Sequence, residues 1–156
     1  MPKVAVGGTF QYLHDGHSKL IEKAFEIVGD GKVYIGLTSD EMLNKNHSID
    51  NYENRRFRLL QYIQKMGFPE DRYEVTRLNN PCGPTLEEDF DSIVVSPETY
   101  PVALKINRLR AEKGKKPLEI VYVEYVMAED GVPISSTRIA KGEIDRHGRL
   151  KNNSEL

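Results

Sequence analysis

The chain has 156 residues, a length that predicts one domain able to bury a five-stranded α/β core. Its formal net charge of −2, from 24 acidic and 22 basic residues, argues against nucleic acid or an acidic membrane as a partner and leaves small molecules. The one cysteine, Cys82, excludes an intrachain disulfide framework. Because the chain also shows no leader-like or long apolar segment, we expect a cytoplasmic protein.

Strands and helices alternate along the first part of the chain. Short, continuously apolar runs at residues 4–6 and 33–37 predict two buried parallel strands. Between them, apolar residues spaced for one buried face predict a helix that starts near Gly16 and ends at Gly29. This unit of about 30 residues suits a right-handed strand–helix–strand crossover.

The middle of the chain adds a helix and a different kind of strand. A polar segment over residues 44–48 predicts a mobile loop, and a second long helix is predicted over residues 52–66. Residues 73–78 alternate apolar and polar side chains, unlike the other predicted strands. This alternation is typical of an edge strand.

The last part of the chain repeats the alternation. Strands at residues 93–96 and 120–123 flank a helix predicted over residues 101–113. Ser135 is expected to cap a short final helix. The segment from His147 onward is polar, and we expect it to fray.

This order of elements predicts a three-layer α/β domain with a doubly wound, Rossmann-like parallel sheet. The edge character of the third strand supports the strand order 3-2-1-4-5, which the resemblance described below also implies. That order places the first strand in the centre and a topological switch point beside residues 7–17. Ligands of open α/β sheets bind at such points.

Residues 7–17, with the sequence GGTFQYLHDGH, join the first strand to the first helix. The two leading glycines let the backbone approach a ligand closely, and the start of the helix offers free N–H groups and a positive dipole end. Phosphate binds well in such a place. His14 and His17 stand there too, as hydrogen-bond donors that can meet developing charge.

Other interpretations of this segment are possible. It matches neither the dinucleotide-binding fingerprint nor the P-loop. His14 and His17 are alternatively half of a metal site, although Cys82, His47 and His147 are distant in the sequence. The simplest alternative is a glycine turn with two solvated histidines.

Two motifs near opposite ends of the chain resemble those of the nucleotidyltransferase superfamily. Residues 14–17 have the form HxGH, and residues 134–139, ISSTRI, resemble the ISSTxI motif. Two motifs in the right order are far more specific than either alone. The tracts AEDGVP at residues 128–133 and GEID at residues 142–145 are similar, more narrowly, to the archaeal pantetheine-phosphate adenylyltransferases.

The resemblance covers most of the chain, from Lys3 to Gly148. It implies a nucleotidyltransferase domain over residues 1–148, followed by a polar tail over residues 149–156. The chain departs from the family at Gln11, where an aspartate is usual.

The reaction that the resemblance implies is adenylyl transfer from ATP to 4′-phosphopantetheine, which gives dephospho-CoA and pyrophosphate. A phosphate dianion is already a nucleophile, so direct in-line attack needs alignment and charge stabilisation and no covalent enzyme intermediate. Mg²⁺ is expected to accompany ATP, held by substrate phosphates rather than by a protein cage. The alternatives are another acceptor, such as nicotinamide mononucleotide, flavin mononucleotide or glycerol 3-phosphate, and a non-catalytic nucleotide-binding module.

The resemblance also implies roles for individual residues. His17 is the first choice for stabilising the transferring α-phosphate, and Lys45 resembles a mobile catalytic lysine of the family. Thr9 and Lys45 are assigned to the acceptor substrate. The predicted nucleotide-binding residues are Thr9, Phe10, His14, His17, Arg110, Ser135, Ser136, Thr137 and Arg138.

Several assignments have a structural alternative. Thr9 and His14 could instead hold the turn in shape, and the tract over residues 135–138 could be a plain helix cap. Lys45 and Arg110 could be solvated surface side chains.

Overall fold

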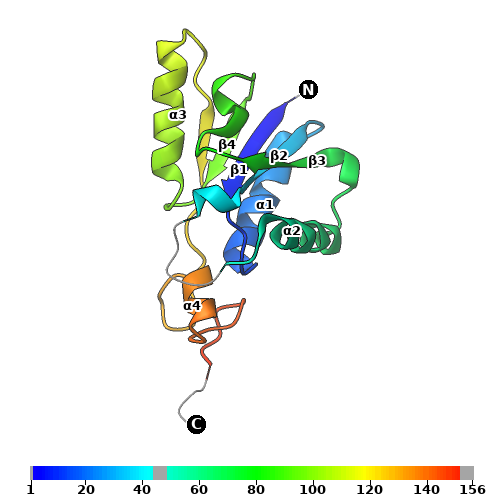
Figure 1. Ribbon diagram of the computed structural model, residues 1–156, viewed down its shortest axis with the longest axis vertical. Helices are drawn as coiled ribbons and strands as arrows, with labels where there is room; N and C mark the ends of the chain where they lie inside the picture. The colour runs from blue at the N-terminus through cyan, green and yellow to red at the C-terminus, as the bar shows by residue number, and fades with distance from the viewer. Residues whose placement is uncertain (1, 44–48, 152–156) are drawn as a thin grey trace.

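The fold is a five-stranded parallel sheet in the order β3-β2-β1-β4-β5 (Figure 1). The computed structural model describes residues 2–43 and 49–151. The strands are Lys3–Gly8 (β1), Lys32–Thr38 (β2), Tyr73–Leu78 (β3), Ser92–Val95 (β4) and Glu119–Tyr122 (β5). The predicted strand order and the edge position of β3 are therefore confirmed.

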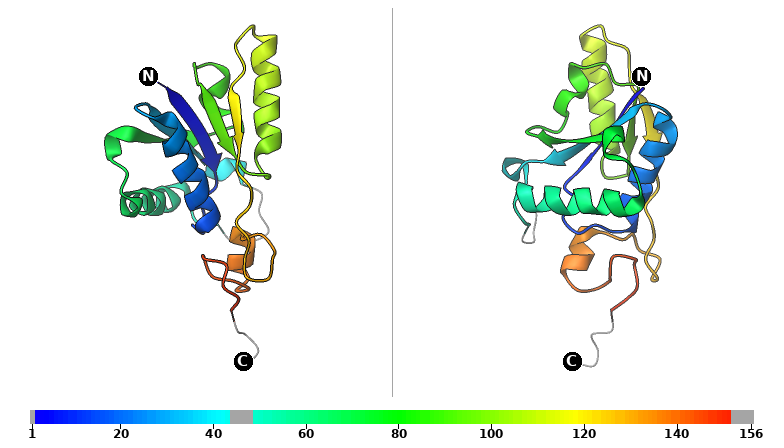
Figure 2. Two further views of the ribbon diagram at one scale, coloured as in Figure 1. Left: turned by 180° about the vertical axis from the view of Figure 1, so that it is seen from behind. Right: turned by 90° about the vertical axis from the view of Figure 1, so that its right-hand side faces the viewer.

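Helices cover both faces of the sheet (Figure 2). They are Asp15–Val28 (α1) and Tyr52–Met66 (α2) on one face and Tyr100–Glu112 (α3) on the other. A further helix, Ser136–Ala140 (α4), lies outside these layers, and short 3₁₀ helices lie at Asp40–Met42 (η1), Glu70–Arg72 (η2) and Gly83–Leu86 (η3). No helix in the described part of the chain is long and apolar enough to cross a bilayer.

Two apolar clusters, one on each face of the sheet, make the three layers. Successive side chains of a strand point to opposite faces, so β1 supplies Val4 and Val6 to one cluster and Ala5 to the other. The first cluster packs against α1 and α2 through residues such as Ile21 and Leu59. Because β1 is buried on both faces, its sequence is continuously apolar rather than alternating.

After β5 the chain leaves the sheet and forms a small C-terminal lobe, residues 124–151, which includes α4 (Figure 1). The lobe has its own apolar cluster, centred on the buried residues Ala128, Ile134 and Ile144. Its chain is closed on itself by an antiparallel bridge between Met127 and Pro133. The lobe lies beyond the carboxyl end of β1, next to the start of α1 (Figures 1 and 2).

The structure differs from the expected frayed tail. The backbone N–H of Leu150 donates to Glu129 Oε1 at 2.9 Å, and that of Lys151 donates to the carbonyl of Glu143 at 3.0 Å. The chain is thus bonded to the lobe as far as Lys151, because its backbone N–H groups pair with a carboxylate and a carbonyl of the lobe. Residues 152–156 lie outside the described part of the chain.

Leu78, at the end of β3, occupies a space that two glycines leave open. A Cβ atom on Gly36 would lie 2.8 Å from Cγ, Cδ1 and Cδ2 of Leu78, and one on Gly83 would lie 2.5 Å from Cδ2. Leu78 is 8% exposed. The lack of a side chain at Gly36 of β2 therefore leaves the space that the side chain of Leu78 fills.

We expect Gly36→Ala to lower the free energy of unfolding by about 1–3 kcal/mol, because overpacking forces Leu78 out of its place. Chemical denaturation measures the loss. In a Leu78→Ala background the same substitution should cost much less, since the clashing atoms are gone. An equal loss in both backgrounds would show that the contact with Leu78 is not the cause.

Candidate active site

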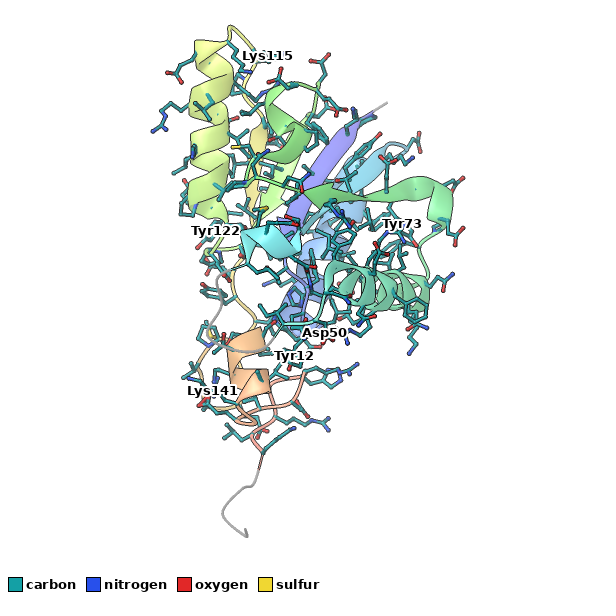
Figure 3. The ribbon with its side chains drawn as sticks, viewed as in Figure 1. Tyr12, Asp50, Tyr73, Lys115, Tyr122 and Lys141 are labelled. Carbon is teal, nitrogen blue, oxygen red and sulfur yellow. The ribbon has the colours of Figure 1, made fainter. Side chains whose placement is uncertain are left out.

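A cavity of about 560 Å³ lies at the carboxyl ends of the strands, between the sheet and the C-terminal lobe. The β1–α1 turn forms one wall, the start of α4 forms another, and the residues after β4 complete it. β1 lies between β2 and β4, so the cavity sits at the predicted topological switch point. Figure 3 labels Tyr12, in the turn between β1 and α1, and Lys141, just after α4.

His14 and His17 cap the start of α1 reciprocally. The backbone N–H of Gly16 donates to His14 Nδ1 at 3.0 Å, and the backbone N–H of His14 donates to His17 Nδ1 at 3.1 Å. The two rings stack, with their centroids 3.9 Å apart. An amide hydrogen can only be donated, so both Nδ1 atoms are acceptors and each neutral ring carries its proton on Nε2. Nε2–H is therefore the group that each ring can offer to a ligand in the cavity.

Both histidines are held neutral in the ligand-free protein. Burial lowers the pKa of His14 to about 4, although the nearby carboxylate of Asp15 opposes the shift. Burial lowers the pKa of His17 to about 3, and the neighbouring His14 adds to that effect. The two residues were expected to donate hydrogen bonds when protonated, whereas here the neutral tautomer supplies the donor.

Thr9 and Phe10 occupy the turn between β1 and α1. The Thr9 hydroxyl accepts a hydrogen bond from Thr38 Oγ1 at 3.2 Å, and its carbonyl accepts one from Arg55 Nη1 at 3.1 Å. Phe10 adopts a left-handed backbone with φ of 50°, and its ring is 1% exposed. That ring lies 5.0 Å from the ring of His17. Phe10 thus supports His17, and its backbone is what it can present to a ligand.

The predicted tract at residues 135–138 faces this turn across the cavity. Ser135 caps α4, as expected, because its Oγ accepts from the backbone N–H of Arg138 at 3.2 Å. Ser136 Oγ donates to the carbonyl of Tyr12 at 3.3 Å, and Thr137 lines the cavity. The two sequence motifs therefore meet in space.

Comparison with known proteins identifies the family. Residues 5–142 match the family described as cytidylyltransferase-like. A phosphopantetheine adenylyltransferase of Methanosarcina acetivorans is 83% identical over 99% of this chain and 99% of its own. Another, from Archaeoglobus fulgidus, is 49% identical over 95% of this chain and 99% of its own. The chain belongs to the phosphopantetheine adenylyltransferases.

Solved structures agree with the fold. A protein of unknown function from Archaeoglobus fulgidus is similar at a TM-score of 0.70 and 44% identity, over 78% of this chain and 88% of its own. A tyrosyl-tRNA synthetase from the same organism reaches a TM-score of 0.63 over 89% of this chain and 60% of its own. Its 14% identity indicates a shared fold alone.

Arg110, which the resemblance to the phosphopantetheine adenylyltransferases predicted to bind nucleotide, is not among the described residues that line the cavity. Arg110 is 2% exposed, and its guanidinium donates to the carbonyls of Thr85, Glu88 and Lys116. These bonds tie α3 to the segments on either side of it, so the geometry gives Arg110 a structural role in place of the expected phosphate contact. Lys45 lies outside the described residues.

Arg138 reaches the cavity already paired. Its Nη2 lies 2.6 Å from Asp130 Oδ2, and its Nε lies 3.6 Å from Glu143 Oε2. Its Nη1 also approaches the carbonyls of Val132 and Pro133. These contacts hold the lobe together, and they leave Arg138 at the cavity wall with much of its charge compensated.

Sequence reasoning assigned no role to Thr38, Glu98 or Glu124, which also line the cavity. Thr38 ends β2 beside the switch point, and polar residues at that place in a parallel sheet are a usable signal. The departure from the family at Gln11 has a structural meaning: its Oε1 accepts from the backbone N–H of Asp50 at 3.0 Å. Gln11 thereby fastens the segment that leads into α2 to the turn.

The described residues contain no group of three His, Cys, Asp or Glu side chains placed to hold a metal ion. His14 and His17 have their Nδ1 atoms committed to capping, so a metal could reach them only through Nε2.

We expect the stability of the ligand-free protein to fall as the pH is lowered from 6.5. An unfolded histidine takes up a proton near pH 6.5, whereas folded His14 and His17 do so only near pH 4 and pH 3. The unfolded state therefore binds more protons in this window. At pH 5 each histidine should account for a loss of up to about 2 kcal/mol relative to pH 7.5.

Urea denaturation between pH 7.5 and pH 5 measures this slope. His17→Asn is the matched control, because an amide oxygen can replace Nδ1 as the acceptor and cannot be protonated in this range. The variant should lose about half of the pH dependence. If its slope equals that of the parent, the buried His17 is not responsible.

Proposed function

We propose that the protein transfers the adenylyl group of ATP to the phosphate of 4′-phosphopantetheine, giving dephospho-CoA and pyrophosphate. The observation that carries the proposal is the meeting of the HxGH turn and the ISST tract in one cavity, in a chain that belongs to the phosphopantetheine adenylyltransferases. The reaction is a step of coenzyme A synthesis, and we expect it in the cytoplasm.

The chemistry is one in-line displacement. An oxygen of the acceptor phosphate forms a bond to the α-phosphorus of ATP, while the bond from that phosphorus to the bridging oxygen of the β-phosphate breaks. The electron pair leaves with pyrophosphate. Because the acceptor is already an anion, the protein has to align two substrates and stabilise charge rather than provide a base or a nucleophile.

We assign the residues by their place around the cavity. His17 donates from Nε2 to the α-phosphate as charge grows on it, and His14 donates in the same way beside it. Thr9 donates to a phosphate oxygen, and the backbone at Phe10 lies against the nucleotide. Ser135, Ser136, Thr137 and Arg138 border the β- and γ-phosphates. Lys45 is proposed, from its sequence position, to reach the reacting phosphates.

The charge of the cavity supports a role for Mg²⁺. Among the described residues that line it, only Glu98, Glu124 and Arg138 carry formal charge when the histidines are neutral, and Arg138 is paired with Asp130. The phosphates of ATP and the acceptor are strongly anionic, so they need further cations. Mg²⁺ bound to the phosphates of ATP supplies such charge.

A panel of acceptor phosphates with each nucleoside triphosphate tests the proposal, with release of pyrophosphate as the readout. We expect ATP with 4′-phosphopantetheine to be the fastest pair, and dephospho-CoA with pyrophosphate to regenerate ATP. Much faster turnover of nicotinamide mononucleotide, flavin mononucleotide or glycerol 3-phosphate would overturn the assignment. Binding of ATP without any turnover would favour a nucleotide-binding module.

We expect His17→Asn to lower kcat by roughly 10²–10³-fold, because it removes a donor that acts mainly in the transition state. ATP affinity should change little. The amide oxygen keeps the capping bond with the backbone of His14, so the melting temperature should also stay close to that of the parent.

His17→Gln is the paired variant, since its longer side chain carries an amide donor out to the position of Nε2 and retains part of the rate. Steady-state kinetics, calorimetry with ATP and a melting curve on both variants give the result. An asparagine variant with near-normal kcat would remove His17 from the catalytic step.

A further inference from the structure

Behind Thr9 lies a chain of hydrogen bonds that begins at a buried arginine. Arg55, on α2, is 0% exposed. Its Nη1 donates to Thr38 Oγ1 at 3.4 Å, and Thr38 Oγ1 donates to Thr9 Oγ1 at 3.2 Å. The chain thus runs from α2 through the end of β2 to the turn after β1, and Thr9 and Thr38 both line the cavity.

The guanidinium of Arg55 is fixed from several sides. Its Nε donates to the carbonyl of Asp50 at 2.9 Å, and Nη1 also donates to the carbonyl of Thr9 at 3.1 Å. Its Nη2 lies 3.0 Å from the carboxylate of Asp40, which compensates its charge. Figure 3 labels Asp50, which lies just before the start of α2. With these partners the arginine cannot turn without breaking several buried bonds.

The direction of the chain follows from chemistry. A guanidinium has only donors, so Thr38 Oγ1 must accept from Arg55, and the hydrogen of Thr38 is then free to be donated onward. It goes to Thr9 Oγ1, which becomes an acceptor on that side. The hydroxyl hydrogen of Thr9 is not used by this series of hydrogen bonds. Because a hydroxyl can rotate, that hydrogen can point toward an acceptor in the cavity.

We propose that Thr38 is a positioning residue, which receives a hydrogen bond from Arg55 and orients the Thr9 hydroxyl to donate into the cavity, onto a substrate phosphate oxygen. The relay rests on the proposed function for the identity of that phosphate. It needs no proton transfer: each group keeps its own hydrogen, and only orientation is passed on. A hydroxyl that is already oriented loses less rotational freedom when the phosphate arrives.

The relay is tested with five proteins: the parent, Thr38→Val, Thr38→Ser, Thr9→Val and the double variant Thr9→Val/Thr38→Val. Valine keeps the branched shape suited to the end of β2 and removes the hydroxyl, whereas serine keeps the hydroxyl. With ATP and 4′-phosphopantetheine, Thr38→Val should lower kcat/KM about tenfold. That loss is on the scale of one hydrogen bond to a charged group. Thr38→Ser should stay within a factor of about three of the parent, because it keeps the hydroxyl.

The double variant separates positioning from mere structural support. If Thr38 acts through the Thr9 hydroxyl, Thr38→Val should have no further effect on kcat/KM in the Thr9→Val background. Multiplicative losses would overturn the proposal, and so would a Thr38→Val variant with the kinetics of the parent.

Thr85→Val is the matched control for losing a buried threonine hydroxyl. Thr85 is 5% exposed, its hydroxyl donates to the carbonyl of Cys82, and it does not line the active-site cavity. This variant, like Thr38→Val, should melt at a lower temperature than the parent, but it should keep the kcat/KM of the parent. A similar kinetic loss in both variants would mean that destabilisation alone explains the effect of Thr38→Val.

Failure of the proposed function would look different. If the parent protein does not react ATP with 4′-phosphopantetheine, the function is wrong whatever the variants do. The relay is then judged by calorimetric ATP affinity in the same set of proteins. The relay is supported if Thr38→Val weakens ATP binding, if Thr38→Ser restores that binding, and if Thr38→Val has no further effect in the Thr9→Val background. Unchanged ATP binding by Thr38→Val overturns the relay.

Discussion

The two hydrogen bonds by which the rings of His14 and His17 cap the start of α1 are the constraint on which the active site depends. Each Nδ1 atom accepts from a backbone amide at the start of α1, so the tautomer of each ring is decided by the helix cap. Burial of the rings keeps both side chains neutral, with the pKa values of His14 and His17 lowered to about 4 and about 3. The rings that cap the helix through Nδ1 are therefore the same rings that can offer Nε2–H to a ligand in the cavity.

Neutral donors suit a reaction between two anionic substrates. A permanently charged side chain would bind the ground state and the transition state alike, whereas an oriented neutral donor responds most to charge that appears during transfer. The described wall of the cavity follows this logic, because its one cationic side chain, Arg138, is paired with Asp130. Further positive charge then has to arrive with the substrates or from elsewhere in the chain.

The C-terminal lobe is joined to the start of α1 by few but specific bonds. Ser136 donates to the carbonyl of Tyr12, the backbone N–H of Asp15 donates to the carbonyl of Arg146, and His147 pairs with the Asp15 side chain. The lobe has its own apolar cluster and adds little to the cores of the sheet. Its place is set by bonds to the β1–α1 turn and the start of α1, so the two motifs are positioned against each other directly.

The sequence by itself determined the strands, the edge position of β3, the start of α1 and the pairing of the two motifs, because each leaves a local pattern: a continuous apolar run, an alternation, a cap or a glycine turn. Only the tertiary structure shows which arginines lie next to the cavity-lining residues. Arg110 donates to the carbonyls of Thr85 and Glu88, away from the cavity, whereas Arg55 donates to the carbonyl of Thr9. Both bind backbone carbonyls far away in the sequence, and since every residue has a carbonyl, such partners leave no mark in the sequence. The same reason explains why the bonded segment from His147 to Lys151 was expected to fray.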